Sequence, residues 1–300
     1  MRVPIFLTSC LLASLSACGG APSGTGQTAS PSASTISRTT ASPPSSPARP
    51  SPSSAPAASS SAASIRPASP LPAVGSSWQI QLQGGLDTTV DAAVFEIDGF
   101  TTPASSVAAL HARGRHVICY LDGGSWEDFR PDAAEFPQSI LGEPYQGYPN
   151  ERWLDIRDQT VLPRILTERL RTQCAGKGFD GVEWDNVEGY ANPSGFPLTA
   201  ADQQRFNTWL AGITHAAGLL VALKNDRQQA GVLAPIYDYA VDEECQQFSE
   251  CGALRGFLEQ GKPVFDVEYD EAAFSCPGPP GVSVILREKV LATGLRRSCR

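Results

Sequence analysis

Four acidic side chains stand within the eleven residues Gly178–Glu188, where an apolar stretch gives way to a loop. A second acidic group, which begins at Asp242, follows the apolar stretch Tyr237–Val241. Carboxylates crowded at the ends of two buried strands are poor for packing but useful for chemistry. If they face each other, one can protonate a leaving oxygen while the other attacks or stabilises a sugar, which is how glycosidic bonds are split. The sequence therefore predicts a two-carboxylate site.

The alternation of side chains along a strand indicates which acids of the first group face the site. Side chains alternate along a strand, so Glu183 and Asp185 point to one side and Trp184 to the other. Asp185, at the strand end, is expected at the site itself. Glu183 lies one layer deeper, where a buried ion pair with Lys224 or an arginine is as good an interpretation as a direct role. Asp180 is interpreted as a strand-entry residue.

Parity also ranks the second group. The apolar Val241 shares its side of the strand with Glu243, which favours Glu243 as the inward acid and leaves Glu244 as an alternative. The distance between two carboxyl groups separates retaining from inverting glycosidases, at about 5 Å against about 6.5 to 9.5 Å. Sequence alone leaves both courses open.

The elements that must position these acids alternate along the chain. Strands are predicted over 78–82, 93–98, 116–121, the start of 178–188, 219–223, 237–241, 263–267 and 282–286, with helices over 103–113, 161–174, 200–217 and 254–260. The segment 125–157 is predicted as a long, functional loop. This α/β order predicts a (β/α)8 TIM-type barrel in one domain, with its site at the carboxyl ends of the strands. A doubly wound sheet is the alternative, but no glycine-rich turn follows the first strand.

Other polar and aromatic residues follow the predicted strands and are expected to line the same pocket. Rings stack on sugar faces and carboxylates attract ammonium groups, so together they predict a groove for amino sugars. The candidate substrate-binding residues are Asp98, Tyr120, Asp122, Trp126, Lys224, Asn225, Glu268 and Tyr269.

The first residues indicate export. Residues 1–17 read as a signal peptide, and Leu15-Ser16-Ala17-Cys18 resembles a bacterial lipobox, which predicts lipidation of Cys18. An ordinary signal peptide cut nearby is the alternative. Residues 19–72 are rich in Ser, Pro and Ala and predict a disordered tether, which leaves 73–300 for the barrel domain. We expect a bacterial membrane lipoprotein or an extracellular protein, with membrane contact only through the lipid.

The charge and the cysteine content of the chain limit its possible binding partners, disulfide bonds and metal sites. The whole chain carries a net charge of -8, and its first 70 residues hold four arginines and no acid, so the remainder is still more acidic. Such a domain should repel nucleic acid and attract polycations. The six cysteines beyond Cys18 predict disulfides, most economically Cys245 with Cys251, Cys276 with Cys299 and Cys119 with Cys174, among fifteen connectivities. Three histidines and no zinc-finger spacing argue against a metal site.

An ordered set of segments resembles glycoside hydrolase family 114, the endo-α-1,4-polygalactosaminidases. The matching segments run from Trp78–Leu82 through Gly124–Asp132, Glu151–Arg157, Gly178–Val187 and Leu223–Asp226 to Glu243-Glu244-Cys245 and Gly261–Phe265. The resemblance implies a barrel, a retaining course, Asp185 as nucleophile and Glu243 as acid/base. One departure is that Asp242-Glu243-Glu244-Cys245 stands where the family has Asn-Glu-Gln-Cys.

The resemblance implies an endo-hydrolase of cationic α-1,4-linked galactosamine polymers. Together with the signal segment, this predicts an exported or surface-anchored enzyme, and we expect it to act as a monomer without a cofactor or metal. A non-catalytic carbohydrate-binding lipoprotein on the same barrel, or a hydrolase of another polysaccharide, are the alternatives. The sequence contains neither a nucleophile-elbow serine motif nor a phosphate-binding glycine loop, which argues against the enzyme classes that use them.

Overall fold

The computed structural model describes residues 69–299. The predicted signal peptide, Cys18 and nearly all of the tether lie outside the described residues, and the boundaries proposed for the three segments stay predictions. Among residues 69–299, no helix is long and apolar enough to cross a bilayer.

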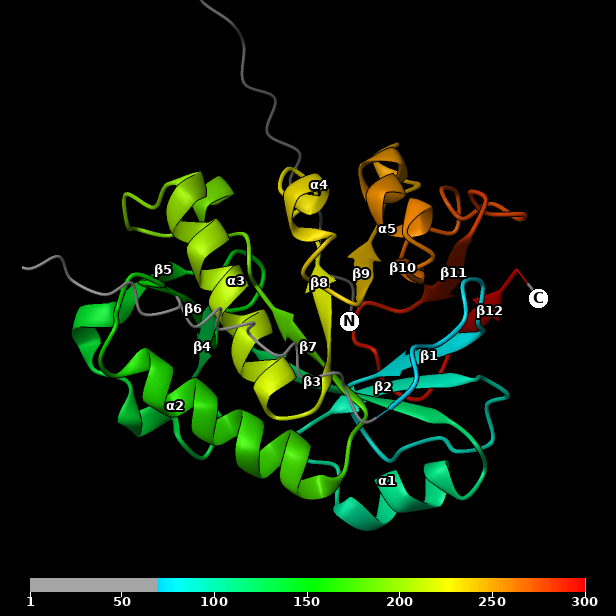
Figure 1. Ribbon diagram of the computed structural model, residues 1–300, viewed down its shortest axis with the longest axis horizontal. Coiled ribbons are helices and arrows are strands. Elements are labelled where there is room, and N and C mark those ends of the chain that lie inside the picture. Colours follow the sequence, from blue (N-terminus) through cyan, green and yellow to red (C-terminus); the bar gives the residue numbers. More distant parts are fainter. Residues whose placement is uncertain (1–68, 300) are drawn as a thin grey trace, which may run out of the picture. The chain divides into compact units, whose positions relative to one another are not determined.

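Eight parallel strands form the centre of the fold (Figure 1). They are β1 (Trp78–Gln81), β2 (Val94–Asp98), β3 (His116–Asp122), β7 (Gly181–Asp185), β8 (Leu220–Lys224), β9 (Tyr239–Glu243), β10 (Val264–Glu268) and β11 (Val282–Arg287), and they neighbour one another in this order. All eight predicted strands are present. The ninth, β12 (Arg296–Ser298), runs antiparallel to β11 and was not predicted.

Alternation along these strands separates two cores. Residues that point inward, such as Ile80, Tyr239 and Phe265, pack together inside the curled sheet. Their neighbours in sequence, such as Trp184 and Leu223, pack in a larger core that also holds helix residues. Because both faces are buried, the strands read as near-continuous apolar runs, which made them visible in the sequence.

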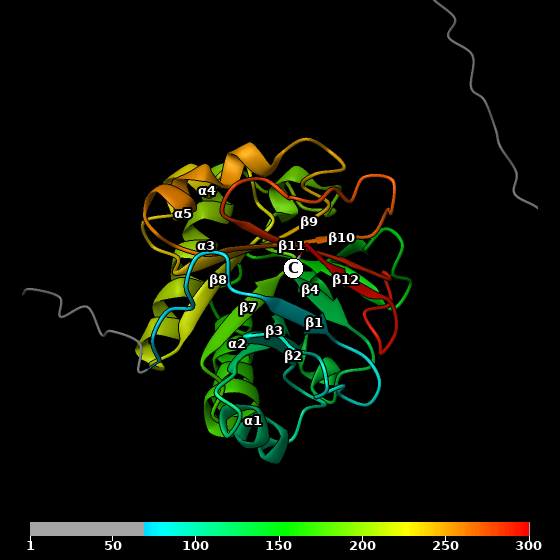
Figure 2. The ribbon, with the colours of Figure 1, turned by 90° about the vertical axis from the view of Figure 1, so that its right-hand side faces the viewer.

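The barrel closes without a regular ladder between β1 and β11. The Trp78 indole donates to the Ser283 carbonyl at 2.7 Å, and the Leu82 amide donates to the Leu291 carbonyl at 2.9 Å. Arg296, on β12, donates to the Trp78 carbonyl at 2.7 Å. Figures 1 and 2 both show β12 beside β1. The first and eighth strands are thus joined by side chains, one loop contact and β12.

Helices pack on the outer side of the sheet (Figure 1). The α-helices are α1 (Ala104–His111), α2 (Leu162–Arg169), α3 (Ala200–Ala216), α4 (Ala230–Leu233) and α5 (Arg255–Glu259). Short 3₁₀ turns cover Ala133–Glu135, Gln138–Ile140, Ala175–Lys177, Gly189–Ala191 and Cys251–Leu254, and a π-helical turn covers Leu170–Cys174. Thr199 and Asp202 form a capping box at the start of α3. The four predicted helices are present, whereas α4, a single turn, was too short to predict.

The segment predicted as a loop over 125–157 contains a second sheet. Its antiparallel strands β4 (Ser125–Glu127), β6 (Glu151–Leu154) and β5 (Leu141–Pro144) lie in the order β4-β6-β5. Each has three or four residues and the pairing of β5 is irregular, so no alternating pattern could form. The loop prediction was therefore wrong in part. This small sheet follows β3, and its first residues stand at the barrel mouth.

The three economical disulfides are present. Cys119 of β3 is bonded to Cys174, Cys245 to Cys251, and Cys276 to Cys299. The first joins a barrel strand to the turn that follows α2, and the second closes the loop directly after Glu243. Each restricts the unfolded chain and so stabilises the fold.

Candidate active site

Asp185 is the last residue of β7 and points into the barrel mouth. The Tyr120 hydroxyl donates to its Oδ2 at 2.7 Å, and the Asn186 amide donates to its Oδ1 at 2.8 Å. Burial, and next the charge of Asp185, raise the pKa of Tyr120 well above its ordinary value, so that the phenol stays a donor. Asp185 is therefore held in one orientation while 16% of its side chain remains exposed.

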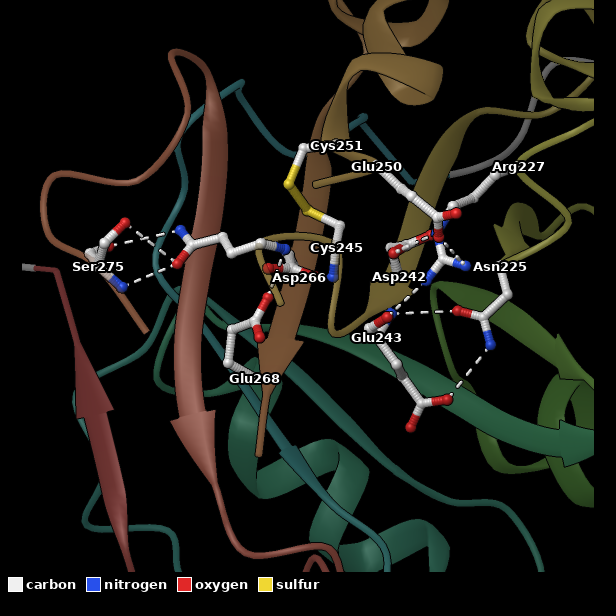
Figure 3. Close-up of a disulfide and its surroundings, with 11 residues drawn as sticks. Asn225, Arg227, Asp242, Glu243, Cys245, Glu250, Cys251, Asp266, Glu268 and Ser275 are labelled. Carbon is white, nitrogen blue, oxygen red and sulfur yellow. Dashed lines mark hydrogen bonds and ion pairs between the residues drawn. A yellow bond between two sulfur atoms is a disulfide. The ribbon is translucent and has the colours of Figure 1, made fainter. Parts of the chain in front are cut away.

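Glu243 is the last residue of β9 and is also held by donors. Tyr269 donates to its Oε1 at 2.5 Å and Asn225 Nδ2 donates to its Oε2 at 3.2 Å. The Glu243 amide donates back to Asn225 Oδ1 at 3.1 Å (Figure 3). Burial, and next the charge of Glu243, raise the pKa of Tyr269 well above its ordinary value. Tyr269 and Asn225 thus fix the direction of this carboxyl group.

Lys224, at the end of β8, joins the two acids. Its ammonium group lies 3.1 Å from Asp185 Oδ1 and 3.6 Å from Glu243 Oε2. Since both oxygens contact one nitrogen, they lie less than about 7 Å apart, within the range that two-carboxylate glycosidases use. Burial opposes the charge of Lys224, but Asp185, Glu183 and Glu243 together raise its pKa well above the ordinary value. The two acidic strand ends therefore meet across one cation.

Glu183 lies beneath this group as half of a buried ion pair. It is fully buried, and its Oε1 lies 3.0 Å from Lys224 Nζ. Next to it, Glu96 of β2 is fully buried, and burial followed by the charge of Glu183 raises the pKa of Glu96 well above its ordinary value. Both oxygens of Glu96 and Oε2 of Glu183 have no hydrogen-bond partner among the described residues, so a protonated Glu96 has a neighbouring acceptor in Glu183. The ion-pair interpretation of Glu183 fits the structure, and Glu96 was missed.

Backbone geometry turns the chain outward directly after these strands. Asn186, Asn225 and Glu244 have φ values of 59°, 48° and 61°, in the left-handed region. Each follows the last residue of its strand, and a non-glycine residue there costs about 1–3 kcal/mol. Glu244 is thereby turned toward Lys289, 3.4 Å away, while Glu243 faces Lys224. The structure thus places Glu243, rather than Glu244, in the site.

A cavity of about 900 Å³ opens over the pair. Of the predicted site residues, Asp98, Tyr120, Asp185, Lys224, Glu243 and Tyr269 line it. Asp98 is paired with Arg130 at 2.7 Å, so its charge is neutralised within the wall. Asn225 lies behind Glu243 and acts on it through hydrogen bonds.

Asp122 and Trp126 lie outside the cavity lining, contrary to the prediction. Asp122 is fully buried and accepts hydrogen bonds from the Ser125 amide and from Asn186 Nδ2, both at 2.6 Å. The Trp126 indole donates to the Ala133 carbonyl at 3.0 Å and its ring packs against the outer core. Both residues hold the connection between β3 and the small sheet, so they position the site without lining it.

Glu268 also lies outside the cavity. Phe265 and Val267 of β10 belong to the inner core, so Glu268 points outward by the alternation of the strand. Its Oε1 accepts a hydrogen bond from the Gln246 amide at 2.7 Å (Figure 3). The prediction treated Glu268 as a cavity residue because it ends a strand. The alternation of side chains that selects Asp185 and Glu243 as inward acids puts Glu268 on the outer side of β10.

Outward-pointing acids support the loop that follows Glu243. Asp242 Oδ1 lies 3.1 Å from Arg227 Nε, and Asp266 Oδ1 accepts a hydrogen bond from the Cys245 amide at 3.2 Å (Figure 3). Burial, and next the charges of Glu268 and Asp242, raise the pKa of Asp266 to about 9, so it is protonated at neutral pH. Asp266 lies near two cysteine sulfurs, but these form a disulfide and offer no thiolate to a metal.

Residues of the small sheet complete the cavity and were missed by the sequence analysis. Glu127 and Glu151 stand at the ends of β4 and β6, and Tyr145 and Tyr148 belong to the turn between β5 and β6. Phe129 lies between β4 and β5 and is 58% exposed. The only signal in the sequence was a long aromatic segment, which indicated function but no individual residue.

Comparison with known proteins identifies the family. The sequence profile of glycoside hydrolase family GH114 matches residues 57–300. The chain belongs to this family. No curated protein sequence matches the chain. The fold and the enzyme class inferred from the residues are thereby confirmed, and the chain is a glycoside hydrolase.

Two solved structures show the same fold. Ega3 of Aspergillus fumigatus, crystallised in complex with galactosamine, is 35% identical, with a TM-score of 0.72 over 76% of this chain and 96% of that one. The glycoside hydrolase domain of PelA from Pseudomonas aeruginosa is 13% identical, with a TM-score of 0.57 over 74% of this chain and 98% of the domain. The second likeness concerns the fold alone.

Proposed function

We propose that this glycoside hydrolase cleaves α-1,4-linked galactosamine polymers within the chain, with Asp185 and Glu243 as the catalytic residues. The carrying observation is that both carboxyl groups contact the ammonium of Lys224 at the floor of one cavity. Membership of GH114 and the likeness to Ega3, whose crystals hold galactosamine, support an amino-sugar substrate.

The two carboxyl groups divide the chemistry in this proposal. Asp185 attacks the anomeric carbon and forms a glycosyl ester, while Glu243 gives its proton to the departing glycosidic oxygen. Glu243 then takes a proton from water, and the hydroxide equivalent displaces Asp185 from the sugar. Tyr120 and Lys224 stabilise Asp185 when it leaves as a carboxylate, and Tyr269 and Asn225 orient Glu243.

The proposal includes a retaining course, because it makes Asp185 the nucleophile. The nearest oxygens of the two carboxyl groups lie less than about 7 Å apart, a limit that is compatible with the spacing of about 5 Å in retaining enzymes. Proton NMR of the first product formed gives the anomer directly. An α-anomer supports Asp185 as nucleophile, and a β-anomer contradicts it.

The acidic charge of the domain supports a cationic polymer. Residues 71–300 hold 19 basic and 31 acidic residues, and Asp98, Glu127, Glu151 and Asp185 line the cavity. Ammonium groups of a deacetylated polymer would be attracted to such a surface. The proposal also includes export, lipidation at Cys18, membrane contact through that lipid alone and a monomeric state. Detergent partitioning of the full chain against Cys18→Ser tests the lipid anchor.

A substrate panel tests the activity. The full chain should release oligosaccharides from an α-1,4-linked galactosamine polymer and none from neutral glucans. Release from another polysaccharide alone would show a different substrate. Binding without cleavage of any polymer by the folded chain would favour the binding-only alternative.

A further inference from the structure

Three acidic residues of the cavity wall, Asp98, Glu127 and Glu151, differ in whether a basic side chain neutralises them. Glu127 Oε2 and Asp98 Oδ2 each lie 2.7 Å from the guanidinium of Arg130, so one cation neutralises both. Glu151, the first residue of β6, lines the same wall. Within residues 69–299, no basic side chain lies at ion-pair distance from Glu151. A half-buried carboxylate that faces a cavity without a cation is a receptor for a cation from outside.

The hydrogen bonding of Glu151 is also incomplete. Its only side-chain donor among the described residues is Ser125 Oγ, 3.3 Å from Oε2. That hydroxyl has one proton, and its oxygen lies 2.6 Å from Asp122 Oδ2. Asp122 is the nearer of the two acceptors, and a carboxylate has about four acceptor positions, of which the contact with Ser125 occupies one at most. Glu151 is therefore left with free acceptor capacity toward the cavity.

Aromatic rings stand next to this acid. Tyr145 and Tyr148 line the cavity with Glu151, and their ring centroids lie 5.5 Å apart. Tyr145 packs on Trp153 at 4.7 Å, which fixes its ring, while Tyr148 is 49% exposed. A carboxylate beside rings fits a sugar that carries an ammonium group, since the ring face takes the apolar side of the sugar.

The opposite flank of the cavity offers no such place. Lys289, Val290 and Leu291 follow β11, the eighth strand of the ring, which is opposite β7, the fourth. Lys289 lies 3.4 Å from Glu244 and over the ring of Tyr269. A cation and two apolar side chains do not attract an ammonium group. Of these two flanks, the one that carries Glu151 is therefore expected to recognise the ammonium group.

We propose that Glu151 binds the ammonium group of one hexosamine unit of the substrate, beside a sugar-binding surface formed by Tyr145 and Tyr148. The proposal rests on the function proposed above and specifies which wall of the cavity requires a free amine. A sugar that is N-acetylated at this position would lose the ion pair and bring an acetyl group against a carboxylate. The chain would then discriminate between deacetylated and acetylated units through one residue.

Binding at this residue should depend on pH. Burial, and next the charges of Glu127 and Asp185, raise the pKa of Glu151 to about 7. The other charged or titratable groups that act on it are Asp122, Arg130 and Tyr148. An ammonium ligand favours the ionised carboxylate, so affinity should rise between about pH 6 and about pH 7.5. Substitution by glutamine should remove this rise, whereas titration of the ligand itself affects both proteins equally.

Calorimetry on the full chain carrying Glu243→Gln tests the proposal without turnover. The ligands are a galactosamine hexamer and its fully N-acetylated form. Adding Glu151→Gln should weaken binding of the free-amine hexamer by about 10-fold or more and leave the acetylated hexamer unchanged. Glu151→Asp should retain part of the affinity and the pH dependence. Glu143→Gln is the matched control, because Glu143 lies on the same small sheet, is exposed and does not line the cavity.

Three results would overturn the proposal: equal weakening for both hexamers, no effect of Glu151→Gln, or no measurable binding of the free-amine hexamer. Hydrolysis by the unsubstituted chain is measured in parallel. Absence of hydrolysis together with binding that depends on Glu151 would count against the proposed function and leave the ammonium site supported. Hydrolysis together with binding that does not depend on Glu151 would support the proposed function and count against the ammonium site.

Discussion

Replacement of Lys224 by methionine tests the charge arrangement beneath the site. Methionine keeps most of the length of the side chain but removes the cation. Glu183 is then left fully buried with a charge that no other basic side chain among the described residues neutralises at ion-pair distance. Asp185 and Glu243 also lose a contact, but they are 16% and 31% exposed and keep their other hydrogen-bond donors. The main cost is expected at Glu183.

The size of that cost follows from the burial of both partners. Two unit charges 3.0 Å apart attract by about 5 kcal/mol at an effective dielectric constant of about 20. Removal of one partner from a buried pair costs about 3–5 kcal/mol, since the other is left uncompensated. We therefore expect the free energy of unfolding at pH 8 to fall by about 3–5 kcal/mol.

The cost should depend on pH with a definite sign. Burial raises the pKa of Glu183 above its ordinary value even with Lys224 present, and loss of the cation raises it further. A raised pKa means that the folded state binds the proton more tightly than the unfolded state. The stabilisation that this tighter proton binding gives the folded state is complete at low pH. It is lost as the pH rises toward the pKa of Glu183 in the folded state. The difference between wild type and Lys224→Met should thus be small near pH 4 and largest at alkaline pH.

Urea unfolding followed by tryptophan fluorescence, with disulfides intact, measures these differences at several pH values. The double variant Lys224→Met, Glu183→Gln should recover most of the lost stability at pH 8, because it removes the uncompensated charge. A difference that stays constant between pH 4 and pH 8, or a double variant no more stable than the single one, would refute the argument that Glu183 is ionised beside Lys224.

Three further predictions concern single contacts. Tyr120→Phe removes the donor to Asp185 and should lower kcat about 10-fold or more with unchanged unfolding, measured by initial rates and circular dichroism. Asn225→Ala removes two hydrogen bonds to Glu243 and should lower kcat more than it raises KM, as steady-state kinetics would show. Asp266→Asn should change stability little near pH 4 and flatten the decline in stability between pH 4 and pH 9, so that the variant is the more stable protein at pH 7 and above, because Asp266, with its pKa raised to about 9, keeps in the folded state a proton that it loses in the unfolded state; an equal decline in both proteins, measured by urea unfolding, would contradict this.

The sequence was sufficient for the barrel and for the inward position of Asp185 and Glu243 because both depend on local patterns. Buried parallel strands leave near-continuous apolar runs, and parity along β7 and β9 decided which acids face inward. The same rule applied to β10 would have placed Glu268 outside, since Phe265 and Val267 are its inward residues.

What the sequence did not reveal depends on contacts between distant segments. The small sheet consists of strands too short to leave a pattern, so the position of Glu151 beside Asp185 could not be predicted. Glu96 lies 87 positions before Glu183 and meets it only inside the closed barrel. The pairing of Lys224 with both catalytic candidates likewise requires three strands to be in register.

Cleavage of an α-1,4-linked galactosamine polymer, measured as the rate of new reducing ends, tests the central claim most directly. The full chain should cleave the polymer, and Asp185→Asn and Glu243→Gln should each lower the rate by about a thousandfold or more while remaining folded. Glu143→Gln should retain the rate of the unsubstituted chain. A folded Asp185→Asn or Glu243→Gln variant that cleaves as fast as the unsubstituted chain would contradict the assignment of the pair.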